Sequence, residues 1–301
     1  MFPIKTILFA TDYSDASEQA FSLASDLAAA RGARLIALHV IAPPLYCSDF
    51  NASMPPSQFF QDTVDRWLRE CRGLGEMPLV ESQVVEGIAS EEILRTADDC
   101  RCDLIVMGSE GRTGIGRSLI GSVAEQVARH AHCPVLICKQ SARPETAAAS
   151  PEPGRPLFST ILFPADLSDR ARQAFVVASA MAGPGSRLIV QHVVAAVDHA
   201  SPGARSTFLH LLRDLYPQGS VVPVVYRLSG GDPAEEIRRA AEDSHCDLIV
   251  MSSQGRTGVG RLLMGSVAEA VFRTVPVPVV IVHTDRPKPA SRPAAARAMG
   301  S

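Results

Sequence analysis

Two glycine-rich segments carry residue types that could bind an anion. Residues 108–122 read GSEGRTGIGRSLIGS, and residues 252–266 read SSQGRTGVGRLLMGS. Glycine lets backbone N–H groups approach a phosphate closely, and arginines beside the loop, such as Arg112, can add charge-assisted hydrogen bonds. Each segment follows an apolar LIVM run and precedes a helical pattern, so the positive end of a helix would face the same anion. The sequence therefore predicts a phosphate-binding loop, present twice.

The spacing of the glycines excludes two common phosphate-binding motifs. A P-loop needs glycine-lysine followed by serine or threonine, and the chain contains no Gly-Lys pair. A dinucleotide fingerprint needs G-x-G-x-x-G after the first strand of a domain. Here Leu119 stands where the third glycine belongs, and the loop follows the fourth expected strand.

Ser122 leaves two interpretations open. In the stretch Ser-Val-Ala-Glu it could cap the following helix together with Glu125, and Ser266 and Glu269 repeat this pattern. Alternatively, the hydroxyl could bind the anion at the same helix end. The two roles are compatible, because a capped helix end is also an anion site.

The chain consists of two copies of one domain. Residues 5–21 align with residues 159–175, and of the 26 positions in 103–128, 19 are identical in 247–272. The stretch between the copies is rich in Pro, Ala and Ser, which is typical of an extended linker, and the C-terminal end has a similar composition. We expect domains at 1–140 and 158–285, a linker at 141–157 and a disordered tail at 286–301.

Each copy alternates apolar strands with helical patterns. In the first copy we expect strands at 4–10, 34–41, 79–86, 103–107 and 134–138. We expect helices at 58–73, 90–100 and 122–131, and a further helix whose apolar stripe runs from Ala20 to Ala28 and which ends at the C-cap Gly32. Nearly continuous apolar strands suit a parallel sheet that is covered on both faces. The sequence therefore predicts two α/β domains, each an open five-stranded parallel sheet with helices on both faces.

Composition narrows the class of partner. The net charge of −3 gives no basic field to attract nucleic acid, and no run of about 18 apolar residues predicts a membrane span. The apolar run before Asp12 is too short for a signal peptide, so we expect a cytoplasmic protein. The seven cysteines are odd in number and lack the spacing of a zinc site, which favours free thiols and no bound metal.

The glycine-rich segment resembles a known motif. Gly108-x2-Gly111-x9-Gly121-Ser122 is similar to the ATP-binding motif of the universal stress protein family, G-2x-G-9x-G-(S/T). DLIVMGSEGRTG, GSVAE and the ILFATDYS of the first strand are also similar to that family. The resemblance covers both halves, so it is to the tandem, UspA-like type. It implies Rossmann-like domains of the adenine nucleotide alpha hydrolase-like class and a stress-response regulator that binds ATP, or ADP or AMP, with Mg²⁺ held mainly by the phosphates.

The resemblance also implies where the nucleotide lies, across the carboxyl ends of strands one, two and four. In the first domain it assigns the adenosine end to Ala10, Thr11, Asp12 and Val40. The ribose and phosphates would be held by Met107, Gly108, Ser109, Gly111, Gly121, Ser122 and Val123. Arg112, beside the loop, would add its charge-assisted contact to the phosphates. For Asp12 the alternative is a helix N-terminal cap.

The second domain departs from the motif at one glycine, since Ser252 stands where the first domain has Gly108. If this position needs a positive φ, serine is strained there; if it needs close approach to the ribose, the Cβ crowds the ligand. We expect ATP in both domains, with weaker binding in the second. The corresponding residues are Pro164, Asp166, Val193, Met251, Ser252, Ser253, Gly255, Arg256, Gly265, Ser266 and Val267.

Two alternatives to a nucleotide-binding regulator remain open. A slow ATPase or nucleotidyl transferase needs a positioned base, but Glu110 in the first loop becomes Gln254 in the second. An interaction scaffold without ligand is the other alternative. The resemblance implies that the last strands, 134–138 and 278–283, pair across the two domains, and that homodimers and further protein partners are conceivable.

His39 and His192 are expected to be hydrogen-bonded structural imidazoles rather than catalytic groups.

Overall fold

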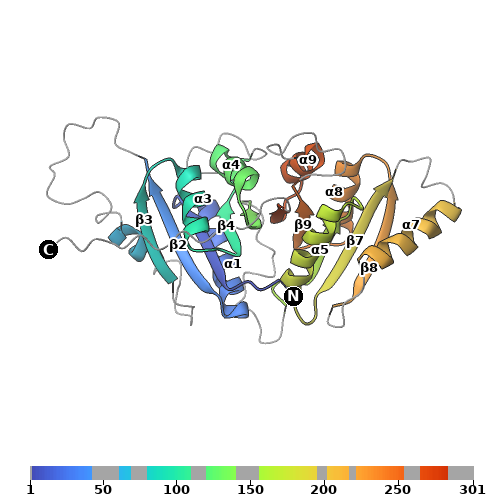
Figure 1. Ribbon diagram of the computed structural model, residues 1–301, viewed down its shortest axis with the longest axis horizontal. Coiled ribbons are helices and arrows are strands. Elements are labelled where there is room, and N and C mark those ends of the chain that lie inside the picture. The colour runs from blue at the N-terminus through green and yellow to red at the C-terminus, as the bar shows by residue number, and fades with distance from the viewer. Residues whose placement is uncertain are drawn as a thin grey trace.

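The computed structural model describes residues 2–42, 61–68, 80–109, 120–139, 156–194, 202–216, 222–253 and 265–283. The expected tail at 286–301 and all of the expected linker except its last two residues lie outside these ranges. Figure 1 shows the two halves of the chain side by side, the first in blue to green and the second in yellow to red.

The strands and helices alternate as the sequence predicts. The first half contains β1 Thr6–Thr11, α1 Asp15–Arg31, β2 Arg34–Ile41, β3 Val80–Glu86, α3 Ala89–Asp99, β4 Leu104–Gly108, α4 Ser122–His130 and β5 Val135–Cys138. Residues 61–68 are also helical, within the helix expected at 58–73. The second half contains β6 Thr160–Pro164, α5 Asp169–Met181, β7 Arg187–Val194, α7 Pro202–Leu215, β8 Val224–Gly230, α8 Pro233–Asp243, β9 Leu248–Ser252, α9 Ser266–Thr274 and β10 Val279–Val282.

Within each half the strands are parallel. The first sheet has the order β3-β2-β1-β4-β5, and β1 pairs with both β2 and β4. In this register Ala10 stands beside Leu38 on one side and beside Met107 on the other. Three small or apolar side chains from three strands therefore meet near the carboxyl end of the sheet, where open parallel sheets bind their ligands.

The two sheets are joined into one by their last strands. β5 and β10 pair in antiparallel fashion, with Leu136 opposite Val280, and the ten strands form one sheet in the order β3-β2-β1-β4-β5-β10-β9-β6-β7-β8. Beside this junction, Lys139 donates to the Val275 carbonyl at 2.7 Å and lies over the Phe272 ring. The predicted pairing of the last strands across the two domains is confirmed.

The helices cover both faces of the sheet. On one face α1 and α5 pack against the strands, and on the other face lie α3, α4, α8 and α9. The core on each face contains residues of both halves. Helix α1 begins at the N-cap Ser14, whose hydroxyl accepts from the N–H of Ser17, and ends at Gly32, whose φ of 58° is the left-handed conformation expected of a C-cap glycine.

An aromatic cluster fills the core beside β1. Trp67, the only tryptophan, stacks on Phe9 with ring centroids 6.1 Å apart and also contacts Phe21. In the second half, Tyr216 takes the corresponding place against Phe163. The fluorescence of Trp67 therefore reports on the packing of the first half alone.

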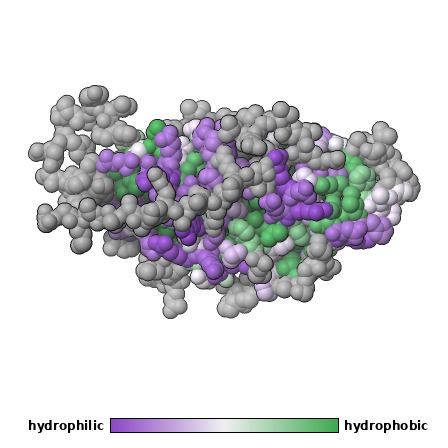
Figure 2. Space-filling model, viewed as in Figure 1, coloured by the Kyte–Doolittle hydropathy of each residue, from purple (hydrophilic) through white to green (hydrophobic). Residues whose placement is uncertain are grey.

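The described surface is mostly polar in the view of Figure 2, with hydrophobic residues gathered on the right, over the second half. The exposed large hydrophobic side chains are Ile88 in the first half and Val176, Leu211 and Val225 in the second. Single exposed apolar residues of this kind are normal in folded proteins.

The shared sheet predicts that damage to β10 weakens the first half as well. Ile281 is fully buried opposite Val135, so Ile281→Ala is expected to lower the free energy of unfolding by about 2–5 kcal/mol. The urea midpoint of Trp67 fluorescence should fall with it, although Trp67 lies in the other domain. Ile88→Ala, at a side chain that is 58% exposed, is the matched control and should leave the midpoint in place. Ile281→Ala could instead lower the urea midpoint measured by circular dichroism and leave the midpoint of Trp67 fluorescence unchanged. That result would show that the two halves unfold independently.

Candidate functional site

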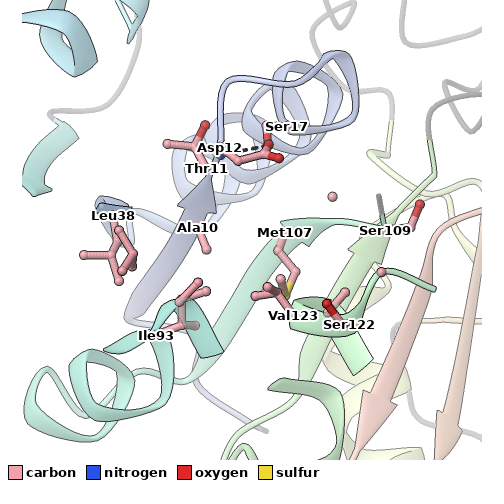
Figure 3. A pocket seen from close by; sticks show the side chains of 15 residues that line it. Ala10, Thr11, Asp12, Ser17, Leu38, Ile93, Met107, Ser109, Ser122 and Val123 are labelled. Atoms are coloured by element: carbon pink, nitrogen blue, oxygen red, sulfur yellow. Dashed lines mark hydrogen bonds between the residues drawn. The ribbon is translucent and has the colours of Figure 1, made fainter. Parts of the chain in front are cut away.

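A pocket of about 190 Å³ lies at the carboxyl ends of β1, β2 and β4 (Figure 3). Ala10, Leu38 and Met107 reach it from the three strands. Ile93 closes it from α3, and Val123 closes it from the first turn of α4. The alternation of strand side chains places Leu38 and Val40 on the same face of β2, so both line the pocket while His39 points to the other face.

The pocket has an apolar part and a polar part. Leu38, Val40 and Ile93 form a slot that could take a flat ring. The polar part consists of Thr11, Asp12 and Ser17 near the start of α1 and of Ser109, Gly121 and Ser122 near the start of α4. Such a combination of apolar walls and a few converging polar groups is typical of small-molecule sites.

Asp12 is held in place by the turn that follows β1. Its Oδ1 accepts hydrogen bonds from the Ser14 N–H at 3.1 Å, the Ser14 hydroxyl at 2.6 Å and the Ser17 hydroxyl at 2.7 Å. The next residue, Tyr13, has a φ of 63°, an uncommon conformation for a bulky residue and one that often accompanies functional sites. Asp12 is not the helix cap, because Ser14 has that role. The cap alternative is wrong, and Asp12 is positioned at the pocket instead.

Helix α4 begins at the pocket without a side-chain cap. Its N-cap is Gly121, and no side chain of the described residues accepts a hydrogen bond from its first turn. The capping box expected at Ser122 is therefore wrong: Ser122 is the first residue inside the helix, and Glu125 pairs with Arg129 instead. The first N–H groups of α4 remain available to an anion, and the helix dipole favours negative charge there.

The glycine before α4 is fixed by two backbone hydrogen bonds. The Gly121 N–H donates to the Ser109 carbonyl at 2.7 Å, and the Ser109 N–H donates to the Cys138 carbonyl at 2.7 Å. The end of β5 thus holds the start of the loop, which in turn holds the start of α4. Burial raises the pKa of the Cys138 thiol to about 12, so this thiol is neutral and only packs beneath the loop.

The second half repeats this frame. Gly265 is the N-cap of α9 and again no described side chain caps the helix, while Glu269 pairs with Arg273 at 2.6 Å. The Gly265 N–H donates to the Ser253 carbonyl at 2.8 Å, and the Ser253 N–H to the Val282 carbonyl at 3.0 Å. The capping box predicted for Ser266 is therefore wrong as well. By contrast, α1, α5 and α8 receive a side-chain cap, from Ser14, Ser168 and Asp232, whereas α3, which begins after Ile88, has none.

Comparison with known proteins decides the family. Residues 3–139 and 157–283 each match the model of the universal stress protein family. The chain belongs to this family. A universal stress protein of Methanocaldococcus jannaschii is 34% identical over 140 residues, which cover 45% of this chain and 82% of that protein. One of Mycobacterium tuberculosis is 27% identical over 220 residues, 68% of this chain and 69% of that protein.

A solved structure agrees on the fold. The universal stress protein of Archaeoglobus fulgidus covers 94% of this chain and 97% of its own, with a TM-score of 0.64 at 21% sequence identity. The expected architecture, two tandem Rossmann-like domains with a parallel sheet and helices on both faces, is confirmed. Within the described ranges, no helix combines the length and apolarity that a membrane crossing needs, and no three His, Cys, Asp or Glu residues come together as metal ligands do.

The structure of this universal stress protein brings most of the predicted first-domain residues to one pocket. Ala10, Thr11, Asp12, Val40, Met107, Gly108, Ser109, Gly121, Ser122 and Val123 all line it. Gly111, Arg112, Gly255 and Arg256 lie outside the described residues. Sequence reasoning missed Ser17, Leu38, Ala89, Ile93 and Ala124, which also line the pocket. Leu38 could have been found from its place two residues before Val40, on the same face of the strand.

The two histidines of the second strands are structural, as the sequence predicts. The Nδ1 of His39 lies 2.8 Å from the Thr11 carbonyl, and that of His192 lies 2.6 Å from the Ala165 carbonyl. A carbonyl only accepts, so each Nδ1 carries the proton. Each imidazole ties its own second strand to the end of the first strand, on the face opposite the pocket-lining Leu38.

Gly108 is constrained by helix α1 rather than by its own backbone conformation. It does not adopt a positive φ, so the strain explanation for a glycine here is wrong. A Cβ at this position would lie 3.0 Å from the Ala16 carbonyl carbon and 3.0 Å from the Ala16 Cβ. The glycine therefore lets the first turn of α1 approach the end of β4.

The second domain differs at this same edge. Ser252 brings a Cβ where Gly108 has none, and Pro164 replaces Ala10. The pairing of β6 with β9 extends only over Ile161 and Leu162, whereas β1 pairs with β4 up to Ala10. Because proline lacks the N–H that a ladder needs, the central strands of the second domain separate earlier at their carboxyl ends.

The close approach at Gly108 predicts that Gly108→Ser strains the first domain. The added Cβ must displace the Ala16 backbone, so the free energy of unfolding should fall by about 1–3 kcal/mol, measured by urea titration of Trp67 fluorescence. Ser252→Gly is the reverse control; it adds no clash and should cost no more than the roughly 0.5–1 kcal/mol of a strand glycine. Unchanged or higher stability of Gly108→Ser would contradict the packing constraint.

Proposed function

We propose that this universal stress protein binds an adenine nucleotide in each domain and acts as a nucleotide-responsive regulator in the stress response. The observation that carries the proposal is the pocket itself, which joins an apolar slot to the uncapped start of α4. A ring that needs apolar walls and an anion that needs N–H donors occur together in a nucleotide. The cytoplasm, where ATP, ADP and AMP are abundant, is the compartment we infer for it.

The slot and the turn after β1 suit a nucleoside. Leu38, Val40 and Ile93 would contact the base, and the backbone of β2 is within its reach. The Asp12 carboxylate, already oriented by Ser14 and Ser17, would accept from a ribose hydroxyl. The volume of about 190 Å³ is below the roughly 300–1,000 Å³ of sites that enclose a whole drug-sized ligand. It therefore suits the nucleoside end, with the phosphates extending toward α4.

The start of α4 suits the phosphates. The N–H groups of its first turn have no side-chain cap from the described residues, and the adjacent Ser122 hydroxyl can donate as well. Gly111 and Arg112 are further predicted phosphate contacts that lie outside the described residues. Mg²⁺ would reach the site with the nucleotide and would be held mainly by phosphates and water.

Binding and signalling are favoured over turnover. Among the described residues that line the pocket, Asp12 is the carboxylate, and its Oδ1 is already occupied by three hydrogen bonds within its own turn. An oriented acceptor of this kind binds a hydroxyl better than it activates water. We infer that protein partners, including a second copy of the chain, respond to the bound nucleotide.

The proposal predicts which variants lose nucleotide. Gly121 and Gly265 have φ near −64° and −62° with extended ψ, which valine also adopts, so Gly121→Val and Gly265→Val should fold. Each isopropyl group would stand where the first phosphate oxygens approach the helix. Protein purified without added nucleotide is denatured, and the released nucleotides are identified by mass spectrometry. Each variant should lose the nucleotide of its own domain, and the double variant should release none.

The control is Gly203→Val, at an exposed glycine whose Cβ would meet nothing within 4 Å. It should retain the wild-type nucleotide content. Adenine nucleotide that persists in a folded double variant would refute the assignment of both sites. Wild-type protein that releases no nucleotide and shows no thermal shift with ATP and Mg²⁺ would favour the ligand-free scaffold.

A further inference from the structure

The second domain carries a buried polar side chain where the first domain has an apolar wall. Leu38 lies beside Ala10 in the β1–β2 register and lines the slot of the first pocket. At the matching place in the β6–β7 register, Gln191 lies beside Pro164. Gln191 is 0% exposed to solvent. The Gln191 amide can form four hydrogen bonds, and it is enclosed at the position where Leu38 lines the slot of the first domain.

The orientation of this amide is fixed by its neighbours. The Nε2 of Gln191 donates to the Ser229 hydroxyl at 2.6 Å and to the Glu236 carbonyl at 3.1 Å. A carbonyl can only accept, so the nitrogen must face Glu236, and both of its protons are used. The Oε1 then points elsewhere. It is buried and has no hydrogen-bond partner among the residues that the structure describes.

An orphaned acceptor of this kind is costly and calls for an explanation. Buried polar atoms almost always have a hydrogen-bond partner. Burying one without a partner costs more free energy than a typical hydrogen bond contributes to stability. The first domain avoids the problem, because Leu38 and Val85 occupy the places of Gln191 and Ser229. The polar pair is therefore a property of the second domain and not of the shared frame.

A second acceptor at the same edge of the sheet is also without a partner. Asp166 follows β6, and its Oδ1 accepts from the Ser168 N–H and hydroxyl. Its Oδ2 is buried and has no partner among the described residues. Its Oδ1 also lacks the donor that Ser17 gives to the Asp12 Oδ1, because Ala171 stands at the position of Ser17. Two buried acceptors at one carboxyl edge favour a ligand that brings donors to both.

We propose that Gln191 determines the ligand specificity of the second domain by accepting a hydrogen bond from an N–H group of the bound ring. The amino group of adenine is such a donor, and a ribose hydroxyl would serve Asp166. The inference rests on the proposed function and deepens it. At the same place the first domain has Leu38, whose side chain cannot accept a hydrogen bond, so the two domains differ in one contact to the ring.

The chemistry of the two slots predicts different selectivity. An apolar slot hardly distinguishes ligands that differ in one polar group, whereas a site built to bond an N–H rejects an analogue without it. A suitable analogue is purine ribonucleoside 5′-triphosphate, whose base has no N–H donor. Replacing ATP by this analogue should cost the second domain at least about tenfold more affinity than it costs the first.

The experiment uses the full chain with one site disabled at a time. Isothermal titration of Gly121→Val reports the second site, and titration of Gly265→Val reports the first. Each is measured with ATP and with the purine analogue. In the Gly121→Val background, Gln191→Leu with Ser229→Val installs the residues of the first domain and should lower the preference for ATP to that of the first domain. In the Gly265→Val background, Leu38→Gln with Val85→Ser should raise the preference for ATP to that of the second domain.

The outcomes separate this inference from the proposed function. If neither domain binds ATP or the analogue, the nucleotide proposal fails and this inference fails with it. If the first site binds ATP while the second binds neither ligand, or binds both equally, the role of Gln191 is refuted and the nucleotide proposal stands. Because the comparison of the two ligands needs no change at Gln191, it remains decisive even if the exchange variants do not fold.

Discussion

The antiparallel pairing of β5 with β10 is the interaction on which the rest of the structure depends. Leu136 and Val280 lie opposite each other in this pair, and both are fully buried. A strand of this composition, left as an open edge, would expose unpaired backbone groups and invite aggregation. By pairing, the two copies protect each other and form one sheet with a continuous core on each face.

The same pairing positions both candidate sites. The carbonyls of Cys138 and Val282 end the paired strands, and they hold the N–H groups of Ser109 and Ser253. Those serines in turn accept from Gly121 and Gly265, which start the uncapped helices α4 and α9. A short chain of backbone hydrogen bonds therefore runs from the junction between the domains to each proposed phosphate site. These contacts are identical in both copies because they involve no side chain that could diverge.

The architecture was predictable from the sequence, because the apolar runs and the repeat both have a direct structural meaning. The start of α4 was not. The stretch Ser-Val-Ala-Glu matches a capping box, but a cap needs extended backbone dihedrals at the serine, and here Gly121 has them instead. The role of Gly108 was equally hidden, since the constraint comes from Ala16, nearly a hundred positions away in the chain. Gln191 was overlooked because its importance depends on strand register and on the position of Glu236.

The missing caps and the orphaned acceptors have one physical interpretation. A folding chain normally satisfies its buried polar groups by itself, as Ser14, Ser168 and Asp232 do for three of the helices. At the carboxyl edges of the two half-sheets, the partly exposed starts of α4 and α9 have no side-chain cap among the described contacts, as is also true of α3. At the same edges, buried acceptors of Gln191 and Asp166 have no partner among the described residues. Donors at one end and acceptors at the other complement a molecule with an anionic end and a donor-bearing ring. In the proposed function, the copies share the donors, which would bind any phosphate, and differ at Gln191, which would discriminate among rings. On that proposal, the two copies keep a common anchor for the phosphates and differ in the part that would select the ring.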